Sequence, residues 1–206
     1  MRTAVLLFAA VLLTSPVYAQ QAAQPEFRSF GYARLGYGGA FADDVRSAPA
    51  IGFGYRGELP SVAFDVSLFN YMVGTGRYDD GSVFAGSVLK LQVLRFLDGE
   101  SDRSPYVGGG FSWAHVSASS NGTPFSSDWH GSGLQGEFST GYEFRGNTPL
   151  RVFIQADVGI PFYRATRESF TVFNAPGSFR STVVDRRFIP SAVVSFGMGW
   201  STRRHP

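Results

Sequence analysis

Segments of about ten residues that alternate apolar and polar side chains recur along almost the whole chain. Successive side chains of a β-strand point to opposite faces, so this period of two predicts strands with one apolar and one polar face. Beyond residue 19 no apolar run reaches the roughly 18 residues that a membrane-spanning helix requires. We therefore expect an all-β protein. Eight such segments can be recognised: residues 29–41, 48–59, 61–72, 82–97, 106–117, 133–145, 150–164 and 188–200.

The composition agrees with an ordered β protein and excludes several other classes. The chain has 25 Gly and 20 Phe, and only 17% of its residues are charged, which is low for a disordered chain. The net charge is +2 without a clustered basic face, so nucleic acid is not an expected partner. The absence of Cys excludes disulfides and thiolate sites, and the three His lack metal-ligand spacing. We expect no metal and no other cofactor.

The first 19 residues have the features of a secretory signal peptide. Arg2 supplies a positive start, residues 4–13 form an unbroken apolar run, and small side chains end at Ala19. The apolar run is too short to cross a bilayer as a helix. We expect cleavage after Ala19, export, and one barrel domain over residues 20–206.

The connector lengths predict a membrane barrel. Short connectors follow the second, fourth and sixth segments, at residues 59–60, 98–105 and 146–149, and the others are mostly longer and polar. Transmembrane β-barrels combine short periplasmic turns, longer outer loops and an even number of strands. Part of the last long connector, residues 165–187, also alternates, which fits two interpretations: the last two strands extend past the membrane as a hairpin, or, as we expect, the alternation only stiffens the loop.

Which face points outward separates a soluble barrel from a membrane barrel, because the apolar face is inside the former and outside the latter. The polar face mixes Gly, Ser and charges of both signs, as suits a crowded polar interior. A face in water would tolerate more lysine than the single one that the whole chain contains. The apolar face carries aromatic residues near the strand ends, as membrane-interface girdles do. These are Tyr37, Phe41, Tyr55, Phe144 and Trp200. We therefore expect an eight-stranded antiparallel up-and-down transmembrane β-barrel.

Three stretches carry a family resemblance: YARLGY at residues 32–37, PYVGGG at 105–110, and GYEF at 141–144 followed by LRV at 150–152. In this order and spacing they resemble the transmembrane domain of outer-membrane protein A and its small relatives. The resemblance implies a bacterial outer-membrane location. It also implies contact with outer-membrane lipids and lipopolysaccharide, and insertion by the barrel-assembly machinery.

In that family, interior charges bridge the barrel and occlude its lumen. The resemblance places five residues of this chain in such a cluster, and the alternation puts all five on the lumen face: Arg34, Asp65, Lys90, Glu143 and Arg151. Unpaired charges in a narrow interior are costly, so both signs must interleave. We expect a plugged barrel with little or no open pore; the alternative is a set of solvated interior residues without an organised network.

His115 and Ser117 form the one candidate catalytic pair. They share the predicted lipid face, where a His-x-Ser pair resembles the lipid A 3-O-deacylase, an outer-membrane esterase. A serine nucleophile needs a histidine that a carboxylate orients. Glu137 and Glu143 are predicted on the lumen face and Asp128 in a loop, and polar residues are ordinary at the outer rim of a barrel. We therefore predict no catalytic residues.

These expectations combine into a non-enzymatic, monomeric outer-membrane barrel with a structural or surface-interaction role, whose long outer loops are available for recognition. Two alternatives remain open at this point. One is a lipid A-modifying esterase that uses His115 and Ser117, and the other is a soluble periplasmic barrel that binds an apolar ligand in an inward apolar face.

Overall fold

The structure is a computed structural model. It describes residues 27–41, 47–75, 82–98, 103–121, 125–144, 149–172 and 180–201. The predicted signal peptide lies outside these residues. The described part of the chain contains no helix long and apolar enough to cross a membrane. Within it lie ten strands: β1 (Arg28–Ala40), β2 (Ala48–Glu58), β3 (Val62–Thr75), β4 (Ser82–Phe96), β5 (Arg103–Asn121), β6 (Phe125–Phe144), β7 (Leu150–Pro161), β8 (Ala165–Val172), β9 (Arg180–Arg187) and β10 (Ser191–Ser201).

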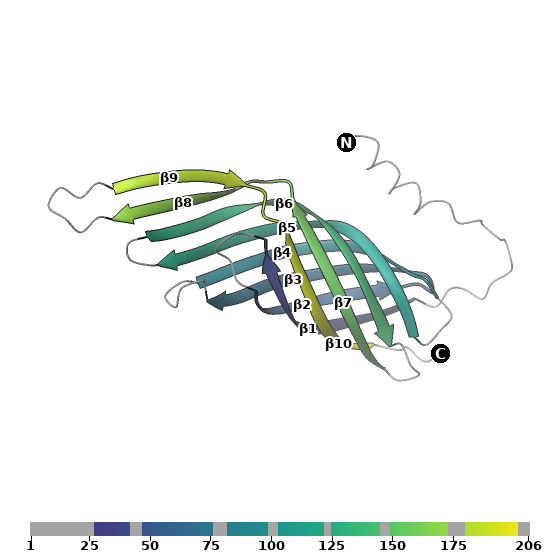
Figure 1. The fold of residues 1–206 in the computed structure, drawn as a ribbon. Coiled ribbons are helices and arrows are strands. Elements are labelled where there is room, and N and C mark those ends of the chain that lie inside the picture. Colours follow the sequence, from purple (N-terminus) through teal and green to yellow (C-terminus); the bar gives the residue numbers. More distant parts are fainter. Residues whose placement is uncertain are drawn as a thin grey trace.

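Eight of these described strands close into an antiparallel barrel, which confirms the predicted fold class (Figure 1). The order around the wall is β5, β4, β3, β2, β1, β10, β7 and β6, and β6 pairs with β5 again. The first and last strands join along their length, from Phe30 opposite Ser201 to Ala40 opposite Ser191. We call the end that carries residues 59–61 the turn end, and the opposite end, where β8 and β9 lie, the hairpin end.

The predicted seventh and eighth barrel strands are too long in the sequence analysis. The seventh was expected to reach Arg164 but β7 ends at Pro161, and the last strand begins at Ser191 instead of Phe188. The residues between form the β8–β9 hairpin, which pairs with β6 through β8 and does not simply prolong β7 and β10. The reason is the length of β6. β7 covers only its residues 135–144, which leaves residues 125–130 free to pair with β8.

The prediction of a long loop between the fifth and sixth strands is wrong. Both strands continue toward the hairpin end, and only residues 122–124 separate β5 from β6. Asp128 and His130 therefore lie on β6, whereas a loop was predicted for both. The segment is rich in Gly and Ser, which obscures the alternation in the sequence although its backbone continues the ladder.

The apolar side chains face outward, which excludes the soluble barrel with an inward apolar face. Leu35 is 66% exposed, whereas its neighbour Arg34 is 2% exposed. Ile154 and Phe196, which are cross-strand partners on β7 and β10, are 48% and 50% exposed. The same alternation runs along the other barrel strands, so an apolar belt surrounds a charged interior. Such a surface is unfavourable in water and suits the hydrocarbon of a bilayer.

Candidate functional site

The guanidinium of Arg56 occupies the interior near the turn end, inside a cage of aromatic rings. β2 directs this residue inward, and its Cζ lies 5.8 Å from the ring centre of Phe30, 5.6 Å from Tyr32, 5.3 Å from Tyr106 and 4.5 Å from Phe153. Arginine stacks favourably on aromatic faces, particularly where water is excluded. The four rings surround the cation with aromatic faces.

Two carboxylates pair with the same guanidinium. Its Nε donates to Asp65 Oδ2 at 2.8 Å and its Nη1 donates to Glu143 Oε2 at 2.7 Å. Its Nη2 donates to Gln155 Oε1 at 3.1 Å, and the Tyr32 hydroxyl donates to Asp65 Oδ1 at 2.8 Å. Asp65 is the cross-strand partner of Arg56 on the adjacent strand β3, whereas Glu143 comes from β6, so the bond to Glu143 joins distant parts of the wall across the interior.

A second charge cluster lies closer to the hairpin end and is centred on Asp157. This carboxylate accepts from Lys90 Nζ at 2.6 Å and from Arg34 Nη1 at 3.0 Å. Lys90 Nζ also lies 3.5 Å from Glu137 Oε2, and Ser112 donates to the other oxygen of Glu137 at 2.6 Å. The two signs of charge therefore interleave, as a low-dielectric interior requires.

Gln155 connects the two clusters through the two ends of its side-chain amide. Its Oε1 accepts from Arg56 and, at 2.8 Å, from the Tyr106 hydroxyl, while its Nε2 donates to Asp157 at 2.7 Å. A single hydrogen-bonded network consequently runs along the interior from the aromatic cage to Lys90. Such networks are most stabilising when their buried members are satisfied, because each unpaired polar group is costly.

The five residues predicted for the interior charge cluster all lie buried inside the barrel: Arg34, Asp65, Lys90, Glu143 and Arg151. The structure brings Arg34 and Lys90 together on Asp157, and Asp65 and Glu143 together on Arg56. Arg151 lies fully buried on β7. The central residues Arg56 and Asp157 were missing from the predicted cluster, although the alternation of their own strands in the sequence places both on the polar face.

Glycines make room for the aromatic cage. Gly54 lies where a Cβ would overlap the ring of Tyr32, and Gly197 where a Cβ would overlap the ring of Phe153. Both are lumen-facing and come from strands next to the ring that they accommodate. The interior near the turn end is filled by rings because the opposing wall positions have no side chain.

Replacing Gly197 by alanine is therefore expected to destabilise the barrel by about 1–3 kcal/mol, since the methyl group forces the Phe153 ring out of its place. The matched control is Gly31→Ala on the outer face, where the nearest atom to a new Cβ is 3.9 Å away. Urea unfolding in lipid vesicles, followed by tryptophan fluorescence, compares the two variants. Equal midpoints would show that the cage is not closely packed.

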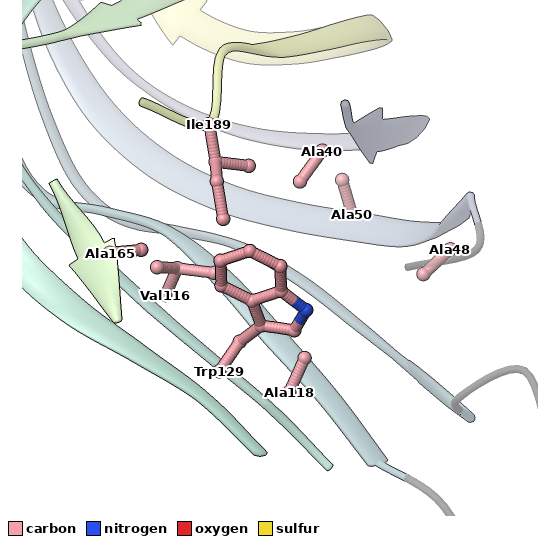
Figure 2. Close-up of a cluster of buried hydrophobic side chains, with 8 residues drawn as sticks. All are labelled: Ala40, Ala48, Ala50, Val116, Ala118, Trp129, Ala165 and Ile189. Atoms are coloured by element: carbon pink, nitrogen blue, oxygen red, sulfur yellow. The ribbon is translucent and has the colours of Figure 1, made fainter. Parts of the chain in front are cut away.

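An apolar layer closes the interior toward the hairpin end. Trp129 projects inward from β6 among small side chains and is 2% exposed (Figure 2). Its buried neighbours are Ala40, Ala48, Ala50, Val116, Ala118, Ala165 and Ile189. The Arg167 guanidinium lies 5.6 Å from the centre of the Trp129 ring. Along the barrel axis, the polar network thus lies toward the turn end and the apolar layer toward the hairpin end.

A small cavity lies at the level between these layers, lined in part by Gln135 and Ser191 on the polar side and by Ala40, Val116 and Ile189 on the apolar side. Its volume of about 20 Å³ has room for one water molecule. Cavities of this size are too small for organic ligands.

The predicted interface aromatics all lie exposed on the outer face of the wall: Tyr37, Phe41, Tyr55, Phe144 and Trp200. Tyr37 and Phe41 lie at the hairpin end of the belt, where the Tyr37 hydroxyl donates to the Ser47 carbonyl at 3.1 Å. Tyr55 and Trp200 lie toward the turn end, both opposite Gly31. An aromatic ring at a membrane interface has this placement, with a polar tip at the border of an apolar belt.

His115 and Ser117 lie on the outer face of β5, beyond the exposed Trp113 in the direction of the hairpin end. Glu137 and Glu143 are buried inside the wall, as expected from the alternation, and face away from the pair. Neither of these two carboxylates can therefore orient His115 toward Ser117.

The neighbouring strand β6 places two further polar residues near this pair. Ser117 lies opposite His130, and Ser119, two residues further along β5, lies opposite Asp128. Sequence analysis missed both neighbours because it placed His130 and Asp128 in a loop.

No group of three His, Cys, Asp or Glu residues that could hold a metal ion occurs in the part of the chain that the structure describes. The outward apolar belt, the closed ladder and the charged interior define a transmembrane β-barrel. Its fold is that of the small eight-stranded barrels of outer membranes.

Comparison with solved structures supports this class. The chain is similar to Neisserial surface protein A, with a TM-score of 0.51 and 12% sequence identity over 84% of this chain and 96% of that chain. It is also similar to a major outer membrane protein from Thermus thermophilus, with a TM-score of 0.50 and 12% identity over 84% of this chain and 98% of that chain. No protein-family model and no curated protein matches the sequence. At this level of identity the likeness concerns the fold.

Proposed function

We propose that this protein is a non-enzymatic, monomeric outer-membrane barrel that anchors a recognition surface at the cell exterior and conducts no solutes. The observation that carries the proposal is the sheet that β5, β6, β8 and β9 form beyond the apolar belt (Figure 1). A barrel that needed only to span the bilayer would not require strands of 19 and 20 residues, because 9–11 residues suffice.

The outer face of this extension differs from the belt below it. Leu134 is the last large apolar residue on the outer face of the described part of β6, and Ser132, His130 and Asp128 follow on the same face toward the hairpin end. All three are exposed, which suits water or lipid headgroups and does not suit hydrocarbon. This change of surface supports a position outside the bilayer core for the β8–β9 hairpin.

The interior supports a closed barrel. The ion pairs Arg56–Glu143 and Lys90–Asp157 join separate parts of the wall across the interior, and Trp129 with its alanine neighbours lies closer to the hairpin end. A solute would have to break buried ion pairs and displace the apolar layer. We therefore assign a structural role to the charge network and no transport role to the lumen.

The proposed setting follows from the same features. The exposed belt contacts outer-membrane lipids, with Tyr37, Phe41, Tyr55, Phe144 and Trp200 at its borders and lipopolysaccharide around the hairpin end. The signal peptide over residues 1–19 directs export, and the barrel-assembly machinery inserts the chain. His115 and Ser117 have no catalytic role in this proposal.

Labelling of single cysteines on intact cells tests the proposed orientation, and the natural chain is suited to it because it contains no Cys. Val183→Cys on β9 is expected to react with a membrane-impermeant maleimide. Ser61→Cys in the turn between β2 and β3 is expected to react only after the outer membrane is permeabilised. Both positions are exposed, so a difference reports the side of the membrane. Labelling of Ser61→Cys alone on intact cells would contradict the proposal.

A further inference from the structure

β9 is the edge of the sheet that extends from the barrel. It pairs with β8 on one side, and no described strand pairs with its other side. An edge strand presents a row of backbone donors and acceptors, to which a further strand can add. β9 has eight residues and lies at the hairpin end, beyond the apolar belt (Figure 1).

The described side chains of β9, those of residues 183–187, leave both faces of the strand accessible. Val183 and Val184 point to opposite faces, and they are 60% and 56% exposed. Natural edge strands are commonly protected by proline, inward charges or a covering segment. The sequence of β9, RSTVVDRR, contains no proline, and its centre is apolar on both faces. An added strand would therefore place apolar side chains against these valines.

The charges of β9 define the kind of strand that fits. Arg186 and Arg187 point to opposite faces at one end of the strand, and Asp185 is ion-paired with Arg187 at 2.5 Å. On β8, Arg167 lies opposite Asp185 and Glu168 lies opposite Val184, so the arginines are concentrated toward the end of β9 that carries Arg186 and Arg187. An incoming strand with acidic residues beside Arg186 and Arg187 gains charge-assisted contacts on both faces.

A second copy of the same chain fits less well. If two β9 strands paired antiparallel about their valines, Arg180 of each strand would lie opposite Arg187 of the other. Like charges opposite one another destabilise a strand pair. The charge distribution therefore favours a different partner.

We propose that β9 is a strand-addition site for an extended acidic segment of another protein, with β-branched or apolar residues at its centre. The inference rests on the exposed hairpin of the proposed function and goes beyond it by specifying the partner. Backbone hydrogen bonds to the edge of β9 supply the geometry of the contact. The valines and arginines supply its selectivity.

The experiment uses the full chain in lipid nanodiscs and three fluorescent eight-residue peptides. The first has two valines at its centre and glutamates on either side of them, the second has the same sequence with its two central residues replaced by proline, and the third has lysine in place of glutamate. We expect the first peptide to bind and to slow amide hydrogen exchange within residues 180–187. The other two are expected to bind at least about tenfold more weakly, because proline cannot form the strand and lysine meets the arginines.

Arg186→Glu combined with Arg187→Glu is expected to weaken binding of the first peptide about tenfold. Arg164→Glu is the matched control, since it reverses an exposed arginine that lies outside β9 and is stacked on Phe188. Heat-modifiable gel migration verifies that each variant is folded.

Several results would overturn the inference. Absence of binding of the first peptide at millimolar concentration would do so. Equal binding of the first two peptides would show that β9 recognises negative charge without strand addition. The partner would then be an anionic surface such as lipopolysaccharide. A β9-dependent dimer in analytical ultracentrifugation would identify a second copy as the occupant. External labelling of Val183→Cys is independent of all three results, so the proposed function can stand when the strand-addition site fails.

Discussion

Replacing Arg56 by alanine is expected to destabilise the barrel by about 3–5 kcal/mol, because the change leaves two buried carboxylates without their common cation. Asp65 and Glu143, both buried, would then lose their ion pairs with Arg56. The aromatic cage would in addition lose the group that fills its centre. Urea unfolding in lipid vesicles measures the loss, and Arg164→Ala is the control because Arg164 is exposed and outside the network.

The same network makes a prediction about conductance. Glu143→Lys places a second cation beside Arg56, and the repulsion between the two cations is expected to open the interior. We expect single channels in planar bilayers for this variant and none for the natural protein. A variant that combines Arg56→Ala with Asp65→Asn and Glu143→Gln removes the charges together and should recover part of the lost stability. An unchanged unfolding midpoint for Arg56→Ala, together with silent bilayers for Glu143→Lys, would show that these ion pairs contribute little.

Ile154→Arg is expected to cost about 2–4 kcal/mol, although the side chain is already 48% exposed. Ile154 lies in the middle of β7, between Tyr142 of β6 and Phe196 of β10, and its exposed surface contacts lipid in a membrane barrel. Arginine at this depth must thin the bilayer or draw water into it. Unfolding in vesicles of known thickness measures the cost, which should fall in a thinner bilayer.

Val184→Arg on β9 is the matched control for this substitution. It introduces the same side chain at a position that is 56% exposed, but beyond the apolar belt. We expect a change within about 0.5 kcal/mol, as at ordinary exposed sites. Similar costs at Ile154 and Val184 would place both positions in the same solvent and would contradict the assignment of the belt to lipid.

The sequence predicted the barrel because a strand with one face in lipid and the other in a polar interior must alternate. Leu35 and Arg34 illustrate the rule: neighbours in sequence, they lie on opposite faces. The centre of the network was harder to predict from the sequence, because alternation assigns Arg56 to a face of its strand but does not identify its partners. Its partners Asp65 and Glu143 lie 9 and 87 residues away along the chain, and only the barrel register brings them together.

Two other features escaped prediction for a different physical reason. Outside the bilayer the outer face of a strand is no longer constrained to be apolar, so β6 loses its alternation beyond Leu134 although its ladder continues. The segment around Trp129 therefore has the composition of a loop, and the apolar layer that this residue forms was not predicted. The boundary between β7 and β8 was missed because apolar residues continue through Phe162.

The pairing of β1 with β10 has a consequence for how the chain reaches its folded state. Phe30 meets Ser201, so the contact that seals the cylinder joins the two ends of the barrel sequence and forms only when the last strand is available. Any shorter nascent chain has two open edges in the barrel sheet and an apolar outer face without lipid. Closure of the cylinder must therefore follow synthesis of β10, and this strand sets the earliest moment at which a stable cylinder can exist.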